Sequence, residues 1–447
     1  MAEEGKYLTS FLEIFVNTDK DLDNLATLDP EEQGTYYHEY FHYIQDITTS
    51  FGLSKIWNGF DRFRQLVVSI QPPIITEVNV PLDGPVAIEQ NAYLDFLEDL
   101  RGSGQIIDVS LEVADSYEIA KVIYEVDPKI SEYFPGSNAT KVRLQLVSKE
   151  NRDKFFTFGE AAISETMAYL IEKKFYPTLN NLPRYPYRVA RDLVEHIYPL
   201  LLNKEENLFA LCDVSLMHNM PGWSFVEILK ELKRQSIVPK SGEEVIEMGY
   251  DFYKTQDWDF LGYMKAADES LQYISAQIFK NPHFEATKVL FQASIERGRL
   301  LRENFPFAVL NIYKADVPLS YDFYKVFNFL GGPHAVNNQG RRVVRVPSGL
   351  EDLRDQVHPQ YFRVIWQLNK FLMEGLRPCS LRLMCEASSN KVPVDDRCEH
   401  TPWRRAEDKY GCPYATFWVM YGFHLKDFYL NGVIIQQRLG ETSSEVL

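Results

Sequence analysis

The sequence is short of basic residues and has no long apolar run. Its 63 Asp and Glu residues outnumber its 47 Lys and Arg residues, which gives a formal net charge of −16. Nucleic acids and anionic membranes bind clustered cations, so neither partner is expected. No run of about 18 apolar residues occurs, so no membrane-spanning helix is expected. The start, MAEEGKYLTS, lacks the basic and apolar regions of a signal peptide. We therefore expect a soluble, cytoplasmic protein.

Cysteine is also scarce, with five residues in 447. Without an export signal, thiols are expected rather than disulfides. Four of the five lie near the end of the chain, separated by 5, 12 and 13 residues: Cys379, Cys385, Cys398 and Cys412. Four thiolates can hold a structural Zn²⁺, with His400 as a substitute ligand, whereas the absence of a CxxC pair favours small buried side chains. Both interpretations stay open.

Local patterns predict a mixed fold. Apolar and alternating residues indicate strands at 11–16, 109–113, 142–146 and 154–158. A capping Asp followed by Pro at residues 29–30 predicts a helix start, and Gly52 predicts its end. Further helices are expected at 86–101 and 159–175, through most of 185–305, and at 359–376, and a loop-rich stretch at 331–349.

These elements predict an α+β fold that is mostly helical, with a small sheet packed on the helix that follows residue 29. The length fits two to three domains or one large domain. We expect a catalytic core at 1–180 with strands inserted at 105–158, a helical region completing the core at 181–376, and a cysteine-containing segment at 377–447.

The motif that carries chemistry is HEYFH at residues 38–42. On a helix, His38 and His42 lie one turn apart on one face, where both imidazoles can bind one Zn²⁺. Glu39 lies beside that metal, where it can take a proton from bound water. A chance HExxH is expected in roughly one such chain in a hundred. A di-iron site would need a second ExxH motif, which the other histidines do not provide.

A third ligand is expected from the helix GEAAISETMAYLIEKKF. It offers Glu160 and Glu165, which are about 140° apart around a helix and cannot both face one metal. Glu165 has small neighbours, Ser164 and Ala168, which allow a close approach of two helices.

Together, HEYFH and the I-S-E segment resemble the gluzincin branch of the zincin metallopeptidases. The resemblance implies His38, His42 and Glu165 as zinc ligands, Glu39 as general base, and a zincin-like fold. Ser164 stands where thermolysin-like members have Asn, and no acid follows at the next turn. The resemblance covers only two short helices. Metzincins are excluded because residues 44–50 contain no third His.

Other roles are assigned by residue type alone. Glu160 is either a partner that orients a ligand imidazole or a solvated acid at a helix start. His334, in the stretch GGPHAVNNQGRR, is a candidate for oxyanion stabilisation or a plain surface histidine; His196 and His218 are weaker candidates. The strand at 11–16, or one of those at 109–147, could offer an edge to an extended substrate.

The sequence therefore predicts a zinc-dependent peptidase that cleaves a protein or peptide with metal-activated water. Two alternatives stay open. One is a non-catalytic protein that uses a zincin scaffold and binds a protein partner through its helical half, residues 181–376. The other is a zinc hydrolase of a non-peptide amide or ester.

Overall fold

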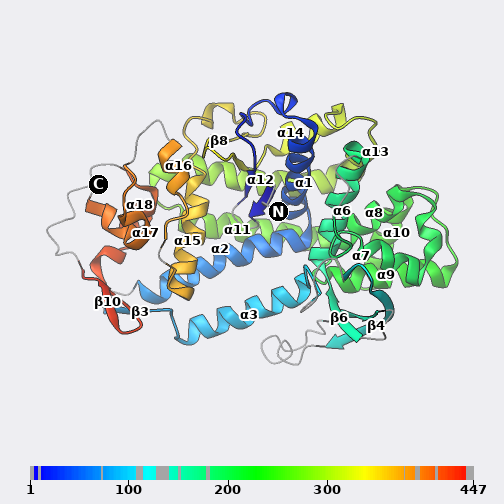
Figure 1. The fold of residues 1–447 in the computed structure, drawn as a ribbon, viewed down its shortest axis with the longest axis horizontal. Helices are drawn as coiled ribbons and strands as arrows, with labels where there is room; N and C mark the ends of the chain where they lie inside the picture. The colour runs from blue at the N-terminus through cyan, green and yellow to red at the C-terminus, as the bar shows by residue number, and fades with distance from the viewer. Residues whose placement is uncertain are drawn as a thin grey trace.

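The computed structural model describes residues 5–8, 12–71, 74–106, 114–126, 140–148, 153–177, 182–376, 378–387, 393–407 and 411–438. In these ranges the chain is mostly helical, with three small sheets, which confirms the α+β class (Figure 1). One large hydrophobic core includes residues from every region of the chain, from Leu12 to Phe428. None of the described helices is both long and apolar enough to cross a membrane.

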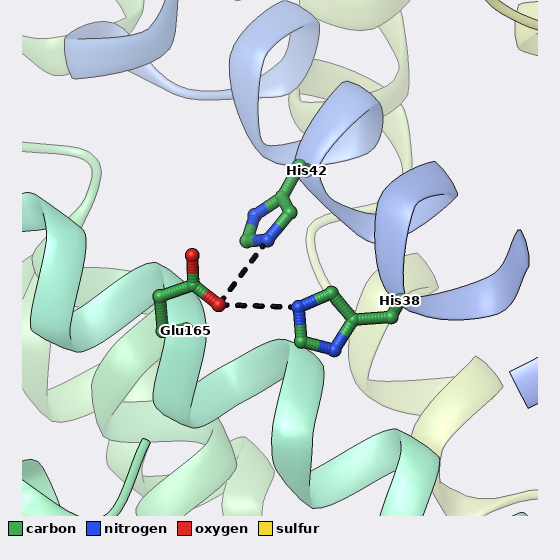
Figure 2. Close-up of side chains that lie close together, drawn as sticks. All are labelled: His38, His42 and Glu165. Carbon is green, nitrogen blue, oxygen red and sulfur yellow. Dashed lines mark hydrogen bonds and ion pairs between the residues drawn. The ribbon is translucent and has the colours of Figure 1, made fainter. Parts of the chain in front are cut away.

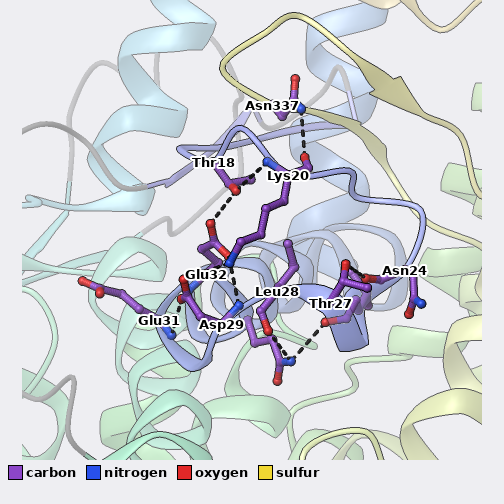
Figure 3. A network of polar contacts seen from close by, with 11 residues as sticks. Thr18, Lys20, Asn24, Thr27, Leu28, Asp29, Glu31, Glu32 and Asn337 are labelled. Atoms are coloured by element: carbon purple, nitrogen blue, oxygen red, sulfur yellow. Dashed lines mark hydrogen bonds and ion pairs between the residues drawn. The ribbon is translucent and has the colours of Figure 1, made fainter.

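Helix α1, Pro30–Thr48, carries the HEYFH motif and begins where the sequence predicts. The Asp29 side chain accepts backbone N–H bonds at the helix start, and the Glu32 side chain accepts the N–H of Asp29. Lys20 bonds both carboxylates, at 3.1 Å and 2.6 Å, and Thr18 donates to Glu32 (Figure 3). Acids at this end also complement the positive end of the helix dipole. The network therefore fixes where α1 starts.

The predicted end of this helix at Gly52 is wrong. Helix α1 ends at Thr48, and the extended residue Thr49 then caps helix α2, Ser50–Ile70, by accepting the N–H of Gly52. Gly52 lies inside α2, where a Cβ atom would come 2.4 Å from the Cα of Asp46. Glycine is needed there because two backbones approach closely, and not because the chain turns into a left-handed conformation.

The C-terminal end of α1 is held by a buried ion pair. Arg302, on helix α12 (Glu285–Asn304), donates to the carbonyl oxygen of Thr48 at 2.9 Å. It also donates to both carboxylate oxygens of Asp213, at 2.8 Å and 2.6 Å, and both side chains are 1% exposed. A cation at this position complements the negative end of the helix dipole. Three helices are thereby joined at one point.

Helix α1 packs against β1 and β2 of a four-stranded sheet with the order β1-β2-β7-β8. Its strands are Gly5–Leu8, Glu13–Val16, His334–Val336 and Arg342–Val343. The strand predicted at 11–16 is confirmed as β2, but it is an interior strand, because β1 covers the edge that we expected it to offer. The stretch predicted as loop at 331–349 contains β7 and β8.

A second sheet precedes helix α6, Glu160–Phe175. Its order is β4-β5-β6, with the bounds Glu118–Val126, Thr140–Val147 and Asp153–Phe158. The strands predicted at 142–146 and 154–158 are confirmed, whereas the one at 109–113 lies outside the described residues. Strand β4 was not predicted. Helix α3, Pro85–Arg101, confirms the helix expected there.

The remaining elements surround this centre. Figure 1 shows α7 to α10 gathered at one end of the molecule and α15 to α18 at the other. The helix bounds are Val189–Ile197 (α7), Glu205–Ser215 (α8), Pro221–Gln235 (α9), Gly242–Thr255 (α10), Phe260–Ile278 (α11), Ala308–Lys314 (α13), Tyr321–Leu330 (α14), Gln360–Glu374 (α15), Arg382–Ala387 (α16), Arg397–His400 (α17) and Pro413–Met420 (α18). The third sheet, in the order β10-β9-β3, joins Val433–Gln436, Asp427–Leu430 and Glu77–Val80. The helices expected within 185–305 and at 359–376 are confirmed.

Candidate metal centre

Helices α1 and α6 bring together the three residues that the sequence indicates as metal ligands. Figure 2 shows His38 and His42 on one helix and Glu165 on the other, with their polar ends pointing toward one another. A Glu165 carboxylate oxygen lies 3.1 Å from Nε2 of His38 and 3.5 Å from Nε2 of His42. Among the described residues, this is the group of His, Cys, Asp or Glu side chains whose ligand atoms all lie within 4.8 Å of one another.

The second nitrogen of each imidazole has its own partner. Nδ1 of His38 lies 3.0 Å from a carboxylate oxygen of Glu172, and Nδ1 of His42 lies 2.9 Å from the amide oxygen of Gln45. Both partners accept hydrogen bonds, so they place the proton of each neutral ring on Nδ1. The Nε2 lone pairs then face Glu165. This is the tautomer that a metal ligand requires.

The electrostatics of the three side chains favour a cation between them. Burial lowers the pKa of His38 and His42. The Glu165 carboxylate raises the pKa of both rings, and Glu172 raises that of His38 further. The net pKa of each ring therefore lies above its usual value. Burial raises the pKa of Glu165, but the two imidazoles outweigh it and hold it well below the usual range. Two lone pairs and a carboxylate oxygen at one point repel each other unless a proton or metal ion lies between them.

Glu39 lies beside this group and is covered by strand β1. The backbone N–H of Tyr7 donates to the Glu39 carboxylate, and a Cβ atom at Gly5 would come 3.0 Å from its Oε1. The Tyr7 ring stacks on His42 with the ring centroids 6.3 Å apart. Burial raises the pKa of Glu39, against the opposing charges of His38 and His42. Glu39 is therefore a stronger base than an exposed glutamate.

Tyr187 is a neighbour of the centre that the sequence did not reveal. It lies in the segment before α7, and its ring centroid is 6.1 Å from that of His38. Burial and the charges of Glu165, Glu39 and Glu172 raise its pKa, so the phenol keeps its proton at neutral pH. A cavity of about 450 Å³ extends from Tyr187 and Tyr169 toward α7 and α8. With 26 tyrosines in the chain, no local pattern singles this one out.

The orienting carboxylate is Glu172 and not Glu160. Glu160 is 2.7 Å from Lys55 and 3.8 Å from Arg101, and Lys55 also pairs with Asp46 at 2.7 Å. Glu160 is 5% exposed, so it is not a solvated acid at the helix start. Its partners are the cations Lys55 and Arg101, so it does not orient a ligand imidazole. The sequence does contain the signal for Glu172, because it follows Glu165 by seven residues and so lies on the same face of α6.

His334 is not brought to the centre. It is buried in β7 with its Nδ1 3.2 Å from a carboxylate oxygen of Glu13, its register partner in β2. Tyr7 pairs with Ile14, the residue after Glu13 in β2. Paired residues share a face of a sheet and successive residues of a strand alternate, so Tyr7 lies on the opposite face from Glu13 and His334. The sheet thus separates His334 from His42. Of the weaker candidates, His196 is exposed at the end of α7 and His218 is buried among aromatic rings.

Comparison of the chain with protein-family models, with curated proteins and with solved structures gives no match in any of the three. The functional argument therefore depends on the geometry of the side chains.

Proposed function

We propose that the protein is a zinc-dependent peptidase with His38, His42 and Glu165 as metal ligands and Glu39 as general base. One observation supports this most directly: two Nε2 atoms and a carboxylate oxygen converge on one point. Two His and one Glu form a known donor set for catalytic zinc, which keeps a further position open. A ligand set of two imidazoles and one carboxylate suits zinc, whereas magnesium and calcium prefer ligand sets made of oxygen alone.

Each side chain has a task in this proposal. Zinc, when bound, supplies a Lewis acid and lowers the pKa of a bound water to about 7. The Glu39 carboxylate accepts a proton from the attacking water and passes it to the leaving amine. Tyr187 remains protonated, so its hydroxyl is the donor that we assign to the oxyanion of the tetrahedral intermediate. Glu172 and Gln45 hold the two rings in the binding tautomer.

The test combines metal analysis with cleavage of a peptide library derived from a proteome. Wild-type protein should hold zinc and cleave a subset of peptides, and chelation should stop cleavage. Glu39→Gln should keep its zinc but lose roughly 10²–10⁴-fold in kcat, because only the proton acceptor is removed. His38→Ala should lose both the zinc of this centre and the activity.

The matched control is Glu31→Gln, the same substitution at an exposed acid in the first turn of α1. It should leave zinc content and cleavage unchanged. Cleavage that persists in metal-free wild-type protein, or full activity in Glu39→Gln, would remove the proposal. If the protein binds zinc and hydrolyses small amides or esters but cleaves no peptide, the zinc assignment would stand and the assignment of a peptide substrate would be wrong.

A further inference from the structure

The four cysteines near the end of the chain do not form a second metal site among the described residues. All are free thiols, and no three of their sulfur atoms lie within 4.8 Å of one another: Cys379, Cys385, Cys398 and Cys412. Cys398 and Cys412 are buried, and the other two are half-buried. This arrangement favours small packed side chains over a metal site.

The cavity beside the candidate metal centre adjoins that centre on two of its walls. Its volume is about 450 Å³, and Tyr187, whose ring centroid is 6.1 Å from that of His38, lines it. Two further wall residues directly follow residues of the centre in the chain, because Thr166 follows Glu165 and Arg188 follows Tyr187. Helices α6 and α7, on either side of the cavity, pack on each other. A substrate held at the centre therefore has this cavity within reach.

Four cations line this cavity, and three of them are held by hydrogen bonds to acids. Arg184 donates to Asp192 at 2.5 Å. Lys173 and Arg191 donate to the same carboxylate, that of Glu205, at 3.1 Å and 3.3 Å. The charges of these three cations are thus offset by partners within the protein.

Arg188 is the fourth cation, and within the described part of the chain its guanidinium makes no hydrogen bond. Its Nε is buried and has no partner. The carboxylate of Asp115 lies 3.6 Å from Nη2, which is beyond hydrogen-bond distance, and it already accepts the backbone N–H of Arg184 at 2.8 Å. A guanidinium has five N–H donors in a planar fork that matches a carboxylate. Arg188 therefore has donors free for a ligand.

Helix stability does not explain an arginine at this position. Arg188 is the residue before the first turn of α7, and its side chain makes no capping hydrogen bond. Ser, Thr, Asp or Asn is preferred there, and a cation opposes the positive end of the helix dipole. An anion bound in the cavity would offset both the helix end and the guanidinium.

Thr166 provides an independent observation on the facing helix. It is 1% exposed, and among the described residues its hydroxyl oxygen has no hydrogen-bond partner. A buried hydroxyl without a partner destabilises a fold unless a ligand or water completes it. Since Thr166 and Arg188 line the same cavity, one ligand with two acceptor oxygens can satisfy both.

We propose that this cavity binds a carboxylate of the substrate, with Arg188 as the cationic donor and Thr166 as a hydroxyl donor. The inference rests on the proposed peptidase function. The carboxylate is the side chain of an Asp or Glu near the cleaved bond, or the C-terminal carboxylate of a short peptide. Both present a planar pair of oxygens that accepts two parallel N–H bonds from a guanidinium.

The first experiment measures carboxylate binding to chelator-treated, metal-free wild-type protein by NMR titration, so that zinc cannot hold the probe. N-acetyl-glutamate N-methylamide carries a side-chain carboxylate, N-acetyl-alanine carries a C-terminal one, and N-acetyl-glutamine N-methylamide carries none. At least one of the two acids should bind, and the one that binds more tightly identifies the source. Binding of neither acid, or equal binding of the glutamine probe, would overturn the proposal.

Three variants locate the binding site of the tighter acid. Arg188→Gln should weaken its binding about 10–100-fold, because a charge-assisted pair of hydrogen bonds is lost. Arg191→Gln is the matched control on the same helix and cavity wall, and its affinity should stay within about threefold of wild type. Asp115→Asn keeps the acceptor for the N–H of Arg184 and removes a competing charge, so it should tighten binding. Equal affinities in Arg188→Gln and wild type, or equal losses in both Arg→Gln variants, would overturn the assignment.

Thr166→Val tests the hydroxyl and separates binding from folding. It should weaken binding of the same acid while the melting temperature stays at least as high as that of wild type, because an unbonded buried hydroxyl is removed. A lower melting temperature with unchanged binding would show that the hydroxyl serves the fold and would remove Thr166 from the site.

The last experiment joins this site to the proposed cleavage. In the proteome-derived peptide library, wild type should prefer peptides with an acid, or with the free C-terminus, at one fixed distance from the cleaved bond. Arg188→Gln should lose this preference and still cleave other peptides. Cleavage by wild type with no such preference would overturn the link to the substrate. If no peptide is cleaved at all, the proposed peptidase function fails, and the probe titrations decide the carboxylate site without it.

Discussion

The contact between Glu172 and His38 leads to a quantitative prediction for metal affinity. Their hydrogen bond measures 3.0 Å, and the side chains are 13% and 11% exposed, so water cannot readily replace the carboxylate. Glu172→Gln keeps the size of the side chain but removes its charge. A hydrogen bond to a charged group contributes about 1.5–3 kcal/mol. Loss of a partner that orients a ligand typically weakens metal binding about 10–100-fold, or about 1.4–2.8 kcal/mol. We expect a weakening within that range.

The assay is competition for zinc between the metal-free protein and a chromophoric chelator at neutral pH. Glu160→Gln is the control, since it makes the same change on the same helix at a buried acid that pairs with Lys55. Its zinc affinity should stay within about threefold of the parent. An unchanged affinity in Glu172→Gln, together with a tenfold loss in Glu160→Gln, would refute the assignment.

Three further predictions concern stability and catalysis. Asp213→Ala should lower the free energy of unfolding by about 3–5 kcal/mol in urea titration, because Arg302 stays buried without its carboxylate; a loss below about 1 kcal/mol would contradict this. Burial lowers the pKa of His218 to about 3, so the unfolded chain takes up a proton below about pH 6.5 and the folded chain does not. The free energy of unfolding should therefore fall with acidification. Between about pH 7 and about pH 5 it should fall by about 2 kcal/mol more in wild type than in His218→Asn, and an equal fall in both would exclude His218 as the cause. Tyr187→Phe should lower kcat roughly 10²–10³-fold at unchanged zinc content, and an unchanged kcat would assign the oxyanion donor elsewhere.

Local patterns predicted the parts of the fold that local forces determine. The Asp29-Pro30 start of α1 depends on side chains within one helical turn, so the sequence alone indicates it. Gly52 was misassigned because its reason is the approach of Asp46 from the preceding helix, which no local pattern contains. Strand β7 was read as loop because its ladder is completed by β2, more than three hundred residues earlier in the chain.

The same distinction applies to the candidate centre. His38 and His42 are one turn apart in one helix, and Glu165 was found by the resemblance of its short motif. Glu172 could have been found from its spacing, because seven residues bring it to the same face as Glu165. Tyr187 reaches His38 only through the packing of α6 and α7 with the preceding segment, so tertiary structure alone reveals it. His334 was selected for its glycine-rich surroundings, which in the structure lead into a buried strand.

Strand β1 covers the general base of the centre, whereas helices carry its metal ligands. The metal-binding side chains stand on two long, deeply packed helices, but the solvent shield of Glu39 is a strand of four residues, ladder-bonded to β2 on one side. Detachment of β1 would hydrate the Glu39 carboxylate and lower its pKa, and it would remove the Tyr7 ring from His42, but the three metal-binding side chains would stay on the same two helices. Basicity and metal affinity would then respond to different perturbations, so that loosening this end of the chain would weaken the base without emptying the ligand set.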